Sequence, residues 1–131
     1  MRTNRWGFGA VIALMIALPL FVQPLLAHHG NAAYDTTKTV KVRGTITDFE
    51  FINPHVMVFF EAQNDKGAVE KWQGELTSPN HLTRAGWTNG TLKPGDQVTL
   101  SGLRAKSGAT TLWITKIIVA DGHEIALSPA D

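Results

Sequence analysis

A single short helical segment stands between stretches of alternating polar and apolar residues, and it limits the folds that this chain can adopt. Ser78 is a typical N-cap, Pro79 suits the first helical position, and Gly86 suits the left-handed residue that follows a helix. Together these signals predict a helix over residues 79–85. Leu82 and Ala85 are the side chains that we expect to face the core.

Three stretches before this helix have the patterns of β-strands. The first covers about residues 40–49 and alternates between polar and apolar residues, which is typical of a half-buried strand. The second, residues 55–63, is apolar on both faces, and the third, residues 69–76, alternates around Trp72. Gly44 lies in the middle of the first strand, where it permits a sharp bend.

Two further strands and a short final segment follow the helix. A turn at residues 94–96 precedes a fourth strand that places Val98 and Leu100 inward. Residues 110–120 have the pattern of a fifth strand. The Asp-Gly pair after it predicts a hairpin that returns a short sixth segment, residues 123–127.

The order of these elements favours one small β architecture. Three strands, one short helix and two more strands is the order of the OB-fold, a partly open Greek-key barrel with its helix between strands three and four. The sequence therefore predicts an all-β domain with one short helix, an OB-fold-like small Greek-key barrel that follows an N-terminal signal peptide. A β-sandwich is the competing fold, but it does not explain a well-capped helix at this point.

The N-terminal stretch has the layout of a secretory signal. Arg2 and Arg5 precede an apolar run, and Ala27 stands where a signal peptidase cuts, so we expect export to the periplasm or secretion. The alternative is an uncleaved anchor, because the apolar run approaches the length that spans a bilayer. The predicted division is a signal peptide (1–27), an extended N-terminal arm (28–39) and an OB-like β-barrel domain (40–127).

The charge balance and the lack of cysteine exclude several classes of protein. Of the 12 basic residues, Arg2 and Arg5 leave with the signal, so ten remain against 11 acidic residues. No cluster of Lys or Arg is present, so we expect no nucleic-acid partner, and no membrane contact after cleavage. Because the chain has no cysteine, disulfides and thiolate metal sites are excluded.

The five histidines all follow the predicted cleavage site, and three of them are candidate metal ligands, namely His28, His29 and His55. Cleavage after Ala27 gives His28 a free α-amino group that can chelate a metal together with its own ring. Nitrogen ligation of this kind suits Cu(II), so copper is the cofactor that the pattern favours. In the alternative interpretations, the His-His pair is a soluble arm and His55 is a turn residue. His81 and His123 are expected at the surface.

The predicted strand length limits whether His28 and His55 of one molecule can bind the same metal ion. A strand from about Val40 to Phe49 spans roughly 33 Å, and the arm is expected to enter at the end opposite His55. The arm reaches at most roughly 40 Å when it is extended. His28 is therefore expected only just to reach His55 within one molecule, and His29 or a second molecule is the alternative source of imidazole.

The remaining motifs favour binding rather than catalysis. Neither a nucleophile elbow nor a phosphate-binding loop is present, and Glu61 and Glu75 are interpreted as solvated strand residues, so we expect no enzyme. The candidate ligand contacts are His55, Met57, Phe59 and Trp113. Met57 and Phe59 are expected on the exposed face of the second and third strands, and Trp113 beside the loop at residues 106–109, with a place in the core or barrel wall as its alternative. The alternatives to copper binding are therefore an OB-type binder of a small molecule or oligosaccharide, or an interaction module for another envelope protein.

Several motifs together resemble a known bacterial family. They are the Ala-His-His-Gly start, Asn53-Pro54-His55, Arg84-Ala85-Gly86-Trp87 and Pro94-Gly95-Asp96. At this spacing the chain is similar to an uncharacterised exported family, domain-of-unknown-function family 6152. Members often carry Trp shortly before Asn-Pro-His, whereas this chain has Phe49 and Phe51. The resemblance implies export and a β-rich single domain, and it implies no known activity.

Overall fold

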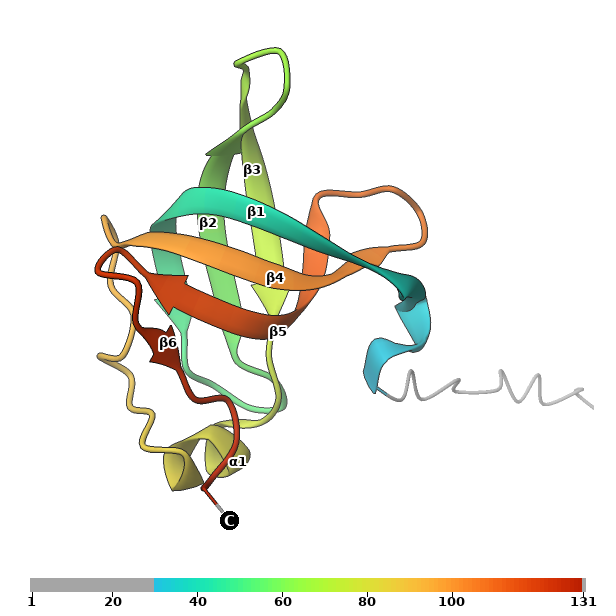
Figure 1. The fold of residues 1–131 in the computed structure, drawn as a ribbon. Helices are drawn as coiled ribbons and strands as arrows, with labels where there is room; N and C mark the ends of the chain where they lie inside the picture. Colours follow the sequence, from blue (N-terminus) through green and yellow to red (C-terminus); the bar gives the residue numbers. More distant parts are fainter. Residues whose placement is uncertain (1–29, 131) are drawn as a thin grey trace, which may run out of the picture.

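A computed structural model describes residues 30–130, and in it six strands and one short α-helix make up the fold (Figure 1). The predicted signal peptide, His28 and His29 lie outside the described residues. The elements in chain order are η1 (Gly30–Ala33), β1 (Tyr34–Glu50), β2 (Met57–Gln63), β3 (Val69–Glu75), α1 (Pro79–Arg84), β4 (Gln97–Ala105), β5 (Thr111–Val119) and β6 (Glu124–Ile125). The predicted class, mostly β with one short helix, is confirmed.

The hydrogen bonds of the sheet close into a ring. The strand order is β3-β2-β1-β4-β5-β6, and each of these neighbours pairs antiparallel. β3 also pairs with β5 in parallel, where Gln73 lies opposite Thr111 and Glu75 lies opposite Trp113. Five strands therefore share one closed bonding pattern, and the short β6 lies beside β5.

β1 is longer than the alternation predicts, because it begins at Tyr34 rather than near Val40. Its pairing with β4 shifts in register between Tyr34 and Thr39, which breaks the alternation that a sequence pattern depends on. Near Thr45 the strand passes from β4 to β2, and this residue pairs with both of them. A Cβ on Gly44 would lie 2.6 Å from the carbonyl oxygen of Glu61, so the close approach of the two strands requires glycine.

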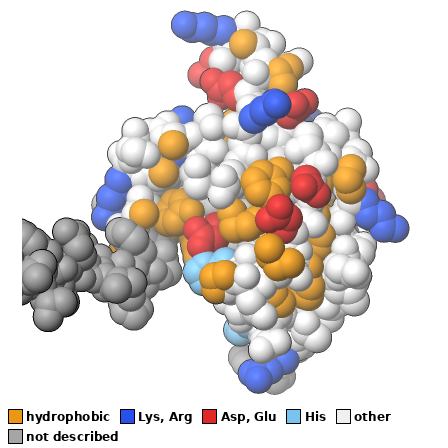
Figure 2. Space-filling view, turned by 180° about the vertical axis from the view of Figure 1, so that it is seen from behind, with side chains coloured by type: hydrophobic (Ala, Val, Ile, Leu, Met, Phe, Trp, Pro, Cys, Tyr) orange, Lys and Arg blue, Asp and Glu red, His pale blue; other side chains and the backbone are white. Residues whose placement is uncertain are grey.

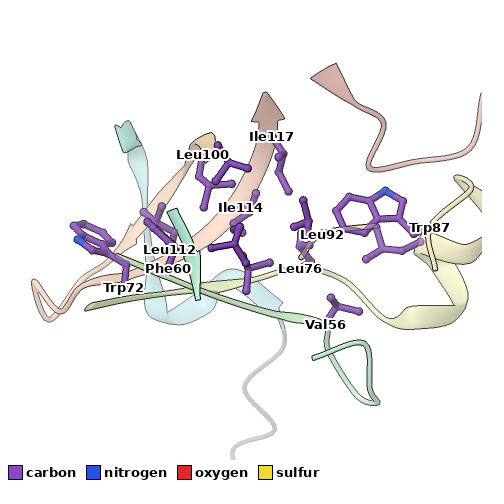
Figure 3. Packing of buried hydrophobic residues seen from close by; sticks show 14 of the residues in the cluster. Val56, Phe60, Trp72, Leu76, Trp87, Leu92, Leu100, Leu112, Ile114 and Ile117 are labelled. Carbon is purple, nitrogen blue, oxygen red and sulfur yellow. The ribbon is translucent and has the colours of Figure 1, made fainter. Parts of the chain in front are cut away.

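The core lies inside this ring and continues under α1. Figure 3 shows Trp72 at one end of the apolar cluster and Trp87 beside the helix at the other end. Leu82 is the buried residue of α1, as predicted. Trp87 packs against the same core and donates a hydrogen bond from Nε1 to the carbonyl oxygen of Ala126 at 2.6 Å, which ties the helix end to the C-terminal segment.

The predicted helix is confirmed to within one residue. α1 runs from Pro79 to Arg84, and the Ser78 hydroxyl accepts a hydrogen bond from the His81 amide. Gly86, just past the C-cap, has a φ of 91°, the left-handed value that favours glycine. Within residues 30–130, no helix combines the length and the apolar character that are needed to cross a bilayer.

Candidate functional site

Glu75, the last residue of β3, is the centre of the most connected polar cluster on the outside of the ring. Its Oε2 accepts a hydrogen bond from the Tyr34 hydroxyl at 2.7 Å, and its Oε1 pairs with Nδ1 of His55. The His55 and Glu75 side chains are 33% and 22% exposed, whereas Tyr34 is buried. The cluster is therefore reachable from solvent on the histidine side and closed on the tyrosine side.

Glu75 accepts hydrogen bonds from two directions. An ionised carboxylate only accepts hydrogen bonds, so Nδ1–H of His55 is the donor to Glu75. Burial raises the pKa of Tyr34 above its ordinary value, and the hydrogen bond to Glu75 and the charge of that carboxylate raise it further. Tyr34 therefore remains a protonated donor to Glu75 throughout the physiological pH range.

Trp113 forms an aromatic wall beside this cluster. It lies on β5 directly opposite Glu75, and its ring centroid is 5.8 Å from that of His55 in an edge-on arrangement. The centroid of the Tyr34 ring is 6.1 Å from the same indole. Because the Trp113 side chain is half-buried, part of its surface faces solvent next to the imidazole.

The first residue of β1 contacts this cluster and the last residue lies two strands from it, which corrects the predicted entry of the arm at the far end from His55. Tyr34, the first residue of β1, reaches Glu75 with its hydroxyl. Glu50, the last residue, lies opposite Met57, which in turn lies opposite Glu75. The expectation was wrong because it treated β1 as a straight rod, whereas the strand wraps around the ring.

A family model described as a family of unknown function (DUF6152) matches residues 18–113, which include Tyr34, His55, Glu75 and Trp113. The chain belongs to the DUF6152 family. The comparison with curated proteins gives no match. In this DUF6152 protein, the three residues of the Glu75 cluster and the adjacent Trp113 therefore lie within the segment that the family model matches.

The interpretation of Glu75 as a merely solvated strand residue is wrong, since both of its oxygens are engaged by side chains. Its sequence pattern carried no sign of this, because Tyr34 is 41 residues away in the chain. Glu61 does not join the cluster. It lies opposite Lys71, four residues before Glu75, so about 13 Å of strand separates the two acids.

The other candidate residues of this DUF6152 chain are divided between the cluster and its surroundings. Met57 and Phe59 are half-buried on the outer side of β2 and alternate with the buried residues Val58 and Phe60. The three histidines within residues 30–130 are not gathered: His55 belongs to the cluster, His81 lies on α1, and His123 is exposed next to β6. Among residues 30–130, no three His, Asp or Glu side chains are grouped closely enough to hold a metal ion.

Proposed function

We propose that this protein is an exported domain that binds copper through His55 together with His28 and His29 at its processed N-terminus. The observation that carries the proposal is the pairing of His55 Nδ1 with the Glu75 carboxylate. Metal-binding histidines commonly donate their second ring nitrogen to a carboxylate, which fixes the tautomer and the direction of the ligating nitrogen. His55 has this arrangement, with Nε2 left as the ligating atom.

The position of the N-terminal segment supports the same site. Tyr34 lies six residues after His28, and six residues span at most about 21 Å. The Tyr34 hydroxyl bonds the same carboxylate as His55, so a residue six positions after His28 contacts this cluster. The reach required for an intramolecular site is therefore much shorter than a straight first strand implies.

The donor set fits copper better than other metals. Residues 30–130 supply one histidine to the proposed site, and the α-amino group and imidazoles of the first two processed residues complete it. Such a set consists of nitrogen donors without cysteine, which suits Cu(II) in a planar geometry. Glu75 and Tyr34 hold the His55 ring, and Trp113 limits the directions from which solvent reaches it.

The copper titration of the processed protein tests this proposal. We expect His55→Ala to weaken copper binding at least tenfold, and His123→Ala, its exposed matched control, to leave the affinity unchanged. One alanine inserted before His28 keeps every imidazole but breaks the chelate on that residue, and it should also weaken binding. Affinity should rise with pH through about 7.7 to 8.0, where an α-amino group loses its proton.

Two results contradict the proposal. Equal copper affinities of the His55→Ala and His123→Ala proteins would remove His55 from the site. Mass spectrometry of the envelope fraction provides the other check, since recovery of a chain that begins at Met1 would remove the N-terminal chelate.

The architecture that we propose for this domain is the OB-fold barrel. Its support is the ring of strands in the order β1-β2-β3-β5-β4 with α1 between β3 and β4, which is the connectivity of that fold. A second candidate function follows from it, binding of a small molecule or oligosaccharide beside Trp113. The half-buried indole next to His55 favours this candidate, because an aromatic face next to polar groups suits a sugar ring.

A further inference from the structure

The outer side of β1, β2 and β3 combines exposed apolar residues with carboxylates. Side chains alternate along a strand, so the inward direction of Phe60 and Trp72 places their neighbours outward. The outward apolar residues are Met57, Phe59 and Val69, and Val69 is 60% exposed. We define these three residues, with the acids that lie opposite or between them, as the outer face.

The register places a carboxylate beside each outward apolar residue of β2. Met57 lies between Glu50 on β1 and Glu75 on β3. Phe59 lies opposite Asp48, and Glu61 follows it two positions along β2. Figure 2 views the molecule from this side, and it shows acidic side chains among hydrophobic ones over the middle of the surface.

Three of these carboxylates, Asp48, Glu50 and Glu61, form no ion pair within the described part of the chain. Among residues 30–130, basic side chains contact carboxylates in two places, the Lys116–Glu124 ion pair and the His55–Glu75 pair, and neither involves Asp48, Glu50 or Glu61. Lys71 lies opposite Glu61 in the register but does not form an ion pair with it. The outer face therefore has an excess of negative charge around its apolar residues.

We propose that the outer face docks an extended segment of another envelope protein in which lysine or arginine alternates with apolar residues. The face runs along β2 from Met57 to Gln63, a length of about 20 Å, which matches about six residues of extended peptide and exceeds a small molecule. Its acids repel nucleic acid and anionic lipid. They attract a basic segment, whose apolar side chains cover Met57, Phe59 and Val69.

Binding of synthetic peptides to the exported protein, as recovered from the cell envelope, tests this proposal. The probe is an eight-residue peptide of alternating lysine and leucine, and the controls replace leucine by serine or lysine by glutamate. A metal chelator is present, so the result does not depend on the proposed copper site. We expect the lysine–leucine peptide to bind more tightly than either control, with affinity that falls as salt is raised.

Charge variants locate the binding. Asp48→Asn combined with Glu61→Gln should lower the affinity for the lysine–leucine peptide about five- to tenfold. Each exposed pair of a carboxylate with a peptide lysine contributes a modest amount of binding free energy. The matched control removes two exposed charges elsewhere, Asp65→Asn combined with Asp121→Asn, and should leave the affinity within about twofold. Amide shifts in the NMR spectrum should be concentrated on β1 to β3.

Three outcomes overturn the proposal. One is equal binding of the lysine–leucine and glutamate–leucine peptides, and another is equal weakening by the two double variants. The third is that the exported protein is a dimer and that Phe59→Gln dissociates it into monomers. The occupant of the outer face would then be a second copy of the chain. A monomer whose lysine–leucine binding is lost in Asp48→Asn/Glu61→Gln supports the proposal.

Discussion

The two faces of β2 and β3 are built from alternate residues of the same segments, yet they differ in every physical respect. Inward, Val58, Phe60 and Trp72 join the buried apolar cluster of the core. Outward, Met57 and Glu75 stand beside each other, and Glu75 bonds side chains from two other parts of the chain. The inner face is satisfied by packing alone, whereas the outer face has charge and exposed apolar surface that packing does not explain.

This difference predicts which substitutions lower stability and which alter binding. A change on the inner side removes packing and lowers the free energy of unfolding. A change on the outer side mainly alters what the protein binds, since solvent and partners replace the lost contacts. Variants of decreasing expected effect on stability test that division.

The largest effect is expected from a charge at the end of the core. Leu82 on α1 has no exposed surface, so Leu82→Asp buries a carboxylate without a partner. We expect the free energy of unfolding to fall by about 4 kcal/mol, measured by urea denaturation. Thr83→Asp places the same charge on the exposed side of the same helix and should cost less than about 1 kcal/mol. Equal effects of the two variants would mean that α1 does not cover the core.

A smaller loss is expected where two strands come closest. Gly102 lies at a register shift between β4 and β5, and a Cβ there would overlap the backbone of Trp113. Gly102→Ala should therefore cost about 2 kcal/mol, because backbone atoms must move to admit one methyl group. Gly90→Ala is the control, since a Cβ at that position meets Thr88 at 3.7 Å. Unchanged stability of Gly102→Ala would show that the space between residue 102 and the backbone of Trp113 admits a methyl group.

Tyr34 is buried beside Glu75 and Trp113, and its removal is expected to have an intermediate effect with a distinct pH dependence. Tyr34→Phe deletes the hydrogen bond to Glu75 and should cost about 1 kcal/mol at neutral pH. Burial, and then the hydrogen bond to Glu75, raise the pKa of Tyr34 in the folded state above its unfolded value near 10. The folded state therefore binds the proton more tightly. The resulting stability is complete below about pH 10 and is lost as the pH rises through the folded pKa.

The stability difference between the parent protein and Tyr34→Phe should accordingly narrow above about pH 10. The chain has one tyrosine, so the absorbance of tyrosinate reports on Tyr34 alone. Ionisation of the folded protein near pH 10 would contradict the closed environment of this side chain.

The elements that could be predicted from the sequence are those with local signals. The helix was predicted at residues 79–85 and lies at Pro79–Arg84, because caps and turn residues act within a few positions. Val98 and Leu100 are buried as the alternation predicts. The Tyr34–Glu75–His55 cluster could not be predicted. It depends on the path of β1 around the ring and on pairs that are 41 and 20 residues apart.

The smallest effect on stability is expected at Phe59, and it gives the sharpest test of the comparison. Phe59 and Phe60 are adjacent on β2, but Phe60 is buried in the core and Phe59 is half-buried on the outer face. Phe59→Gln should lower the free energy of unfolding by less than about 1 kcal/mol, because the amide stays in water and no core cavity opens. Phe60→Gln, the matched inner variant, should cost more than about 3 kcal/mol. If Phe59→Gln costs as much as Phe60→Gln, the outer face belongs to the core, and its apolar residues need no partner to explain them.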